Sequence, residues 1–137
     1  MIPLRVLVAT AFFIAPCGSS HADDQPNINP ASPFRIGEGY AETPATCETV
    51  SKWIKQAPTY DGRFSMTIVG PIVASHWDGA LAYLVMCDPA GVQIMCVTYA
   101  MRDVDPNTEV MMAGGYQRIS KNQVVLDPCL ATDLTID

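Results

Sequence analysis

Cysteine, histidine and methionine are the residues of this chain whose side chains could bind a soft metal. The sequence has five cysteines, two histidines and seven methionines. His76 lies beside Trp77, and Met86 follows in an apolar stretch. Imidazole and thioether groups suit Cu(I), so His76 and Met86 are candidate copper ligands. Methionine is also a common filler of apolar cores, and the primary expectation is a chain without a cofactor.

The cysteines have a second chemistry, which is disulfide formation. Four of them follow residue 40, and an even number in a small exported domain predicts two disulfides among Cys47, Cys87, Cys96 and Cys129. If the turn at residues 88–91 is tight, Val85 faces Ile94 and Tyr83 faces Cys96. Cys87 and Cys96 would then sit ~13 Å apart along the hairpin, beyond disulfide reach. Each is therefore expected to bond to Cys47 or Cys129, and the choice between these partners stays open.

Catalytic chemistry finds little support in the sequence. Ser75 and His76 are only neighbours in the chain, and no cysteine is expected to be free as a thiolate. Asp103 and Asp105 could act as a carboxylate pair, but acidic loops are usually solvated. We therefore expect that the protein is not an enzyme.

Aromatic residues offer a binding hypothesis instead. Tyr83, Tyr99 and Tyr116 could line one face of a sheet and stack on a ligand, with Arg118 at its edge. The alternative is that these rings are half-buried core. The net charge of −6 works against nucleic acid, which binds through Lys and Arg. The expected ligand is a peptide, a glycan or a partner protein of the cell envelope.

The first 22 residues have the layout of a cleavable signal peptide. Arg5 precedes the apolar run at residues 6–15, and small and polar residues lead to Ala22. The run is too short to span a bilayer, so no transmembrane segment is expected. Cleavage near Ala22 predicts a periplasmic or secreted protein. Cys17 leaves lipidation open as an alternative, because the residues before it faintly resemble a lipobox.

The remainder divides into a flexible arm at residues 23–42 and a single domain at residues 43–137. The arm is rich in Asp, Asn, Pro and Gly, although Phe34, Ile36 and Tyr40 could dock against the domain. Pro44 follows a capping threonine and predicts the start of a helix at residues 44–57. Its apolar stripe predicts a plug over one end of a barrel, and consists of Cys47, Val50, Ile54 and Ala57.

After residue 62 the apolar period changes to two, which predicts strands. Turn residues divide the rest of the chain into five candidate strands, at residues 63–74, 79–87, 92–101, 109–117 and 122–127. The sequence therefore predicts a mainly β domain with one N-terminal helix and an antiparallel meander.

Four segments of this meander carry a resemblance to a known fold. They are residues 67–72 with Gly70, the hairpin at residues 84–92, the entry at residues 104–110, and Gly114-Gly115-Tyr116. Bending glycines and tight turns are what a small coiled barrel requires. The layout resembles that of small bacterial periplasmic OB-fold proteins. The resemblance implies a five-stranded antiparallel OB-like barrel that serves as a binding or structural module. A cystatin-like α+β fold, typical of a small secreted inhibitor, is the alternative.

Overall fold

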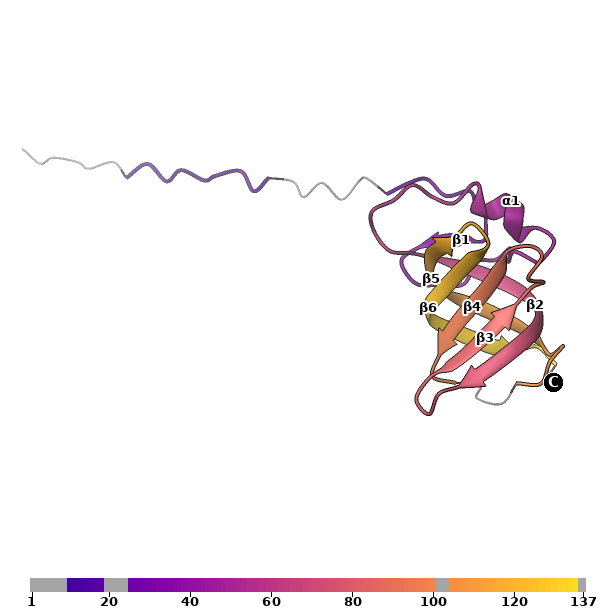
Figure 1. Cartoon of the computed structure of the whole chain (residues 1–137). Coiled ribbons are helices and arrows are strands. Elements are labelled where there is room, and N and C mark those ends of the chain that lie inside the picture. The colour runs from indigo at the N-terminus through magenta and orange to yellow at the C-terminus, as the bar shows by residue number, and fades with distance from the viewer. Residues whose placement is uncertain (1–9, 19–24, 101–103, 136–137) are drawn as a thin grey trace, which may run out of the picture.

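A computed structural model describes residues 10–18, 25–100 and 104–135 of the chain. Figure 1 shows the strands arranged as a small barrel. In chain order, the elements are β1 (Phe34–Ile36), α1 (Val50–Ile54), β2 (Phe64–Trp77), β3 (Ala82–Met86), β4 (Gln93–Thr98), β5 (Glu109–Ser120) and β6 (Gln123–Asp133). No described helix has the length and apolarity needed to cross a bilayer.

Strands β2 to β6 close into a barrel. Their order is β2-β3-β4-β6-β5, and β5 pairs again with β2, while β1 adds a short strand beside β2. The expected mainly β fold with one helix and a five-stranded OB-like barrel is thus confirmed. Closure of the sheet excludes the cystatin-like alternative.

The barrel is mixed, and the expectation of an all-antiparallel barrel was wrong. β6 lies between β4 and β5 and pairs with β4 in parallel. The reason is topological. Successive strands reverse direction, so β4 and β6 run the same way, and β6 fills the gap that β5 leaves by pairing with β2.

The β3–β4 hairpin is offset by one residue from the expected register. Leu84 faces Cys96 and Val85 faces Met95, whereas we expected Tyr83 opposite Cys96. Cys87 has a positive φ of 79° and leaves the ladder, which lengthens the loop beyond the tight turn that the sequence predicts. Cys87 is thereby directed away from the hairpin and toward Cys47.

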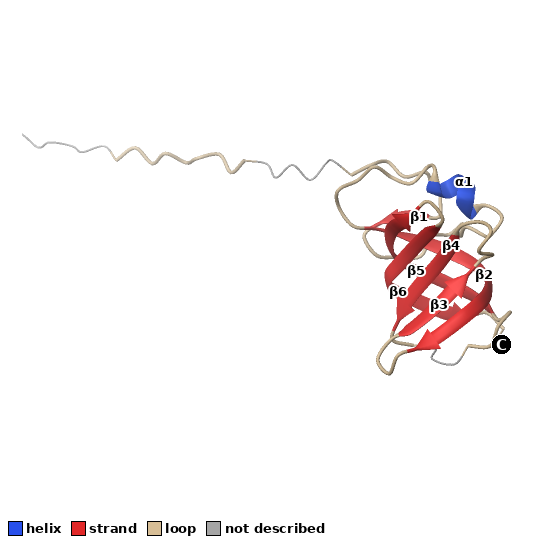
Figure 2. Ribbon diagram, viewed as in Figure 1, coloured by secondary structure: helices blue, strands red, loops and turns tan. Residues whose placement is uncertain are grey.

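The helix is shorter than the predicted segment at residues 44–57. Ala45 forms a parallel bridge with Ile68, in which Ala45 N–H donates to the Thr67 carbonyl at 2.9 Å. A backbone held in a β pairing cannot begin a helix at Pro44. The predicted stripe nevertheless packs as expected, because Val50 and Ile54 are buried in the main core. Figure 2 shows α1 at one end of the barrel, in the position predicted for a plug.

Part of the segment expected to form a flexible arm is ordered on the barrel. Phe34 of β1 pairs with Met66 of β2 and is 1% exposed. Downstream, Ala41 N–H donates to Thr67 Oγ1 at 2.9 Å. Residues 34–36 thus add a short strand beside the start of β2, and Phe34 docks as its apolar character predicts.

Candidate ligand-binding surface

The outward side of β3 and β4 is apolar. On the inward side, Leu84, Met86, Ile94 and Cys96 are fully buried. Side chains alternate along a strand, so the intervening residues face out of the barrel. In the cross-strand register Tyr83 faces Val97, Val85 faces Met95, and Met95 faces Val125. We call this set the outer apolar face, and it consists of Tyr83, Val85, Met95, Val97 and Val125.

A solvated antiparallel surface usually alternates apolar residues inside with polar residues outside. The outer apolar face breaks this rule over three adjacent strands. Four of these side chains are half-buried, and Val125 is 9% exposed. Contiguous apolar surface that neighbouring residues leave partly uncovered is typical of interaction sites in soluble proteins. This face is therefore the first part of the candidate site.

A polar cluster borders the outer apolar face. Tyr83 OH donates to Asp78 Oδ2 at 2.9 Å, and the His76 and Tyr83 rings lie 6.2 Å apart. Backbone N–H groups of Leu81 and Ala80, together with Tyr83 OH, lower the pKa of Asp78. The hydrogen bond to Asp78 raises the pKa of Tyr83, and partial desolvation adds to this effect. Near neutral pH the cluster thus presents a carboxylate held by a neutral phenol.

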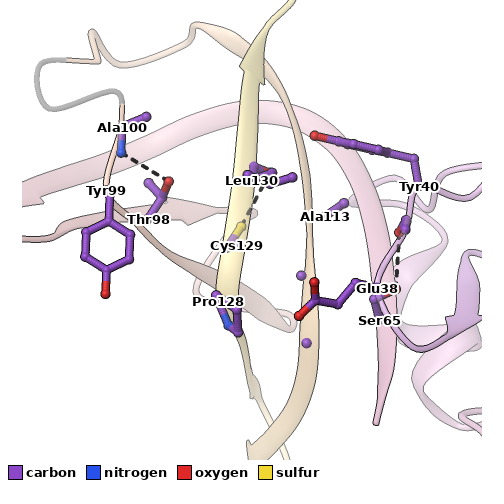
Figure 3. A pocket seen from close by; sticks show the side chains of 13 residues that line it. Glu38, Tyr40, Ser65, Thr98, Tyr99, Ala100, Ala113, Pro128, Cys129 and Leu130 are labelled. Carbon is purple, nitrogen blue, oxygen red and sulfur yellow. Dashed lines mark hydrogen bonds between the residues drawn. The ribbon is translucent and has the colours of Figure 1, made fainter.

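Tyr99 connects the outer apolar face to a groove. It follows Val97 by two residues and is 80% exposed. The groove has a volume of about 280 Å³. Figure 3 shows Tyr99 on one side of it and Tyr40 on the other, with Pro128 and Leu130 between them. Leu130 is 63% exposed, an unusual exposure for a leucine within a strand.

The groove exists because β6 parts from β4. Their parallel pairing ends at Cys96 and Leu126. Pro128, two residues later, has no N–H to continue the ladder. On its other side β6 lies very close to β5, since a Cβ on Gly114 would come within 2.5 Å of the Pro128 carbonyl oxygen. Glycine is therefore required at position 114 for this close pairing.

The predicted ligand-binding residues fall in different places. Tyr83 belongs to the outer apolar face, and Tyr99 extends that face into the groove. Tyr116 packs inside an aromatic cluster, with ring distances of 5.2 Å to Phe64 and 5.4 Å to Phe34, and burial raises its pKa. Arg118 lies at the β5–β6 hairpin, where it donates to the carbonyls of Ser120 and Lys121. The structure thus brings Tyr83 and Tyr99 to one surface, and Tyr116 and Arg118 lie away from it.

The two candidate copper ligands also lie apart. Met86 is fully buried inside the barrel, with its sulfur near Gly70. His76 is exposed and pairs across the strands with Tyr83. Within the described residues, no group of three or more His, Cys, Asp or Glu side chains could hold a metal ion.

Two disulfides are present, as the sequence predicts, and the structure decides their pairing. Cys47 bonds to Cys87, and Cys96 bonds to Cys129. Cys17 is an exposed free cysteine. Two disulfides in a domain this small are typical of proteins that fold in an oxidising compartment outside the cytoplasm.

Tyr40 and Leu130 are site residues that sequence reasoning did not select as ligand contacts. The available signal was the apolar Leu130 directly after Cys129, beyond the point where the predicted fifth strand stops at residue 127. In comparisons with known proteins, no family model matches the chain, and no curated protein matches it significantly.

Proposed function

We propose that this chain is an exported, non-enzymatic binding module of the bacterial cell envelope, of the periplasmic OB-fold type, which recognises a peptide or a partner protein. The observation that carries the proposal is the outer apolar face on β3, β4 and β6. Burying such a surface stabilises a complex by the hydrophobic effect, at about 25 cal/mol per Å² of apolar area.

The compartment is part of the proposal. The signal-peptide pattern at residues 1–22 and the two disulfides both support export. Phe12 and Phe13 are almost fully exposed, as expected of a segment that is removed and does not join the core.

A peptide or protein ligand fits the face better than a glycan does. Sugars present many hydroxyl groups that require hydrogen-bonding partners. The side chains of the outer apolar face offer one hydroxyl, on Tyr83, and it is already bonded to Asp78. Copper binding is also less favoured, because His76 and Met86 lie on opposite sides of the barrel wall.

The test is capture from periplasmic extract by the immobilised mature chain, residues 23–137. Val97→Arg places a charge on the outer apolar face, opposite Tyr83. Thr59→Arg introduces the same side chain at an exposed loop position away from it and serves as the matched control. We expect one or a few proteins to be captured by wild type and by Thr59→Arg, and lost with Val97→Arg. Equal capture by all three proteins would contradict the proposal.

A further inference from the structure

We propose that the edge of β6 takes an extended, basic peptide as an added strand, with one of its apolar side chains seated in the groove. The β6 edge is defined here as Cys129–Asp133. The inference rests on the proposed function and names the class of partner. The β6 edge adjoins the outer apolar face through Tyr99 and the groove, and separate variants on the edge and on the face test the two.

The first observation is an unpaired side of a strand. Beyond Leu126, β6 pairs with β5 alone among the described residues, from Cys129 opposite Gly114 to Asp133 opposite Val110. β4 ends at Thr98. A strand edge presents N–H and C=O groups that another chain can pair with, and peptide recognition by strand addition uses such edges.

The ladder shows which backbone groups point to the open side. Leu134 N–H donates to the Glu109 carbonyl at 2.9 Å, in continuous register with the β5–β6 pairing. In an antiparallel pair, residues alternate between those that bond to the partner strand and those that face away from it. Leu130 and Thr132 therefore bond to β5. Cys129, Ala131 and Asp133 direct their N–H and C=O groups to the open side.

The groove supplies a place for a side chain beside this edge. Leu130 and Tyr99 stand exposed along it, and Figure 3 shows both at the groove. Small-molecule pockets usually measure about 300–1,000 Å³. At about 280 Å³, the groove is better matched to one large apolar side chain than to a cofactor.

Charge selects the partner. Several carboxylates belong to β6 or lie near it. Asp127 and Asp133 are on β6 itself, and Leu134 N–H bonds to the backbone of Glu109. Asp127 also acts electrostatically on Tyr83, which is bonded to Asp78. None of the described Lys and Arg residues lies within the β6 edge; they belong to β1, to α1 and the residue after it, to the residue before β2, and to the β5–β6 hairpin, and they are Arg35, Lys52, Lys55, Arg63, Arg118 and Lys121. Arg63 reaches the far margin of the groove, where it is paired with Glu38 at 3.3 Å. Arg102 and Asp103, whose formal charges cancel, lie outside the described residues.

This charge distribution distinguishes a basic peptide from a second copy of the chain. Edge-to-edge pairing of two β6 strands would bring Asp127 and Asp133 of one copy near those of the other. Like charges in that position oppose association. A lysine- or arginine-rich strand would instead meet opposite charges and gain in association rate, with an effect that salt screens.

The experiment measures fluorescence anisotropy of a labelled peptide, acetyl-(Lys-Val)₄-amide, with the mature chain. The first control peptide replaces Lys by Glu. The second keeps lysine but carries an N-methyl group on every residue, so it retains the charge and has no N–H group on either edge to donate to a ladder. We expect the lysine peptide to bind and each control to bind about tenfold more weakly or worse.

Two variants locate the binding. Ala131→Pro removes an N–H that faces the open side and leaves the β5 ladder intact, and Leu130→Ser removes an apolar wall of the groove. Ile119→Ser, at an equally exposed apolar residue of β5, is the matched control. Circular dichroism and thermal midpoints confirm folding. We expect about a tenfold loss of affinity with Ala131→Pro and Leu130→Ser, and none with Ile119→Ser.

Three results would overturn the inference. The first is that the lysine peptide does not bind to the wild-type protein. The second is that the N-methylated peptide binds as tightly as the lysine peptide. The third is that sedimentation shows a concentration-dependent dimer of the chain, and that Ala131→Pro abolishes this dimer. If Val97→Arg removes peptide binding while Ala131→Pro leaves it unchanged, the edge is not the site but the proposed function stands. The opposite result is also informative. If Ala131→Pro loses peptide binding while Val97→Arg and Thr59→Arg still capture the same envelope proteins, the β6 edge is supported as the peptide site. The proposal that the outer apolar face binds the partner is then contradicted.

Discussion

Cys47 and Cys87 lie 5.3 Å apart between Cα atoms and are joined by a disulfide. Cys47 precedes α1, and Cys87 follows β3, so this bond connects the helical segment to the end of the β3–β4 hairpin. Val50 and Ile54 of α1 pack into the barrel core beside it. The cross-link therefore holds the plug over this end of the barrel.

Replacing Cys47 and Cys87 together by alanine should lower the free energy of unfolding by about 3–4 kcal/mol, because the bond closes a loop of 40 residues in the unfolded chain. Urea denaturation of the oxidised protein measures this change. Wild type treated with a reductant should show a larger loss, since the Cys96–Cys129 bond is then also broken. A loss below about 1 kcal/mol would show that the bond does little to hold the plug.

Ile54→Ala should lower the free energy of unfolding by about 2–4 kcal/mol through a cavity between α1 and the barrel, because Ile54 is 4% exposed. Lys55→Ala, at the neighbouring exposed position, should leave stability nearly unchanged. Peptide affinity of the folded Ile54→Ala variant should equal that of wild type. An undiminished stability together with lost peptide binding would show that α1 is itself the recognition surface.

The Asp78–Tyr83 pair should have a defined pH dependence. The lowered pKa of Asp78 means that its stabilising contribution is present above the ordinary Asp value of about 3.9 and is lost as pH falls through the lowered pKa. The raised pKa of Tyr83 makes stability depend on pH in the opposite direction. Its contribution is present below about pH 10 and is lost as pH rises through the raised pKa.

Tyr83→Phe tests this coupling. We expect the pKa of Asp78, followed by the NMR shift of its carboxyl carbon, to rise toward the ordinary value. It should stay below that value, because the Leu81 and Ala80 N–H groups remain as donors. The same Asp78 titration curve in wild type and in Tyr83→Phe would show that the 2.9 Å hydrogen bond is not formed in solution.

Gly114→Ala should destabilise the barrel by about 1–3 kcal/mol, since the new methyl group would lie 2.5 Å from the Pro128 carbonyl oxygen and 2.9 Å from Cys129 Cα. These neighbours are backbone atoms that cannot move aside alone. Gly39→Ala is the control, because no atom lies within 4 Å of its added Cβ. The thermal midpoints of the two variants are compared. Equal midpoints would show that β6 does not lie as close to β5 at Gly114 as in this structure.

Several features of this protein could be predicted from local patterns in its sequence. The change of apolar period after residue 62 predicts the strands, because alternation of side chains is a property of each strand by itself. The stripe at Val50 and Ile54 predicts the buried side of the helix, because the periodicity of a helix is likewise a local property. The number of cysteines predicts two disulfides. The predicted end of the fifth strand at residue 127 was wrong, because β6 continues through Pro128 to Asp133.

Only the tertiary structure decided which distant segments became neighbours. The insertion of β6 between β4 and β5 requires pairings between strands far apart in sequence, and it determines that Cys96 meets Cys129. Pairing of Ala45 with Ile68 converts predicted helix into extended chain, since a tertiary hydrogen bond competes with local helix propensity. The position of the outer apolar face and the exposure of Leu130 also depend on which strands became neighbours. A pattern with a period of two shows which residues share a side, but which neighbours cover that side depends on strand order and register.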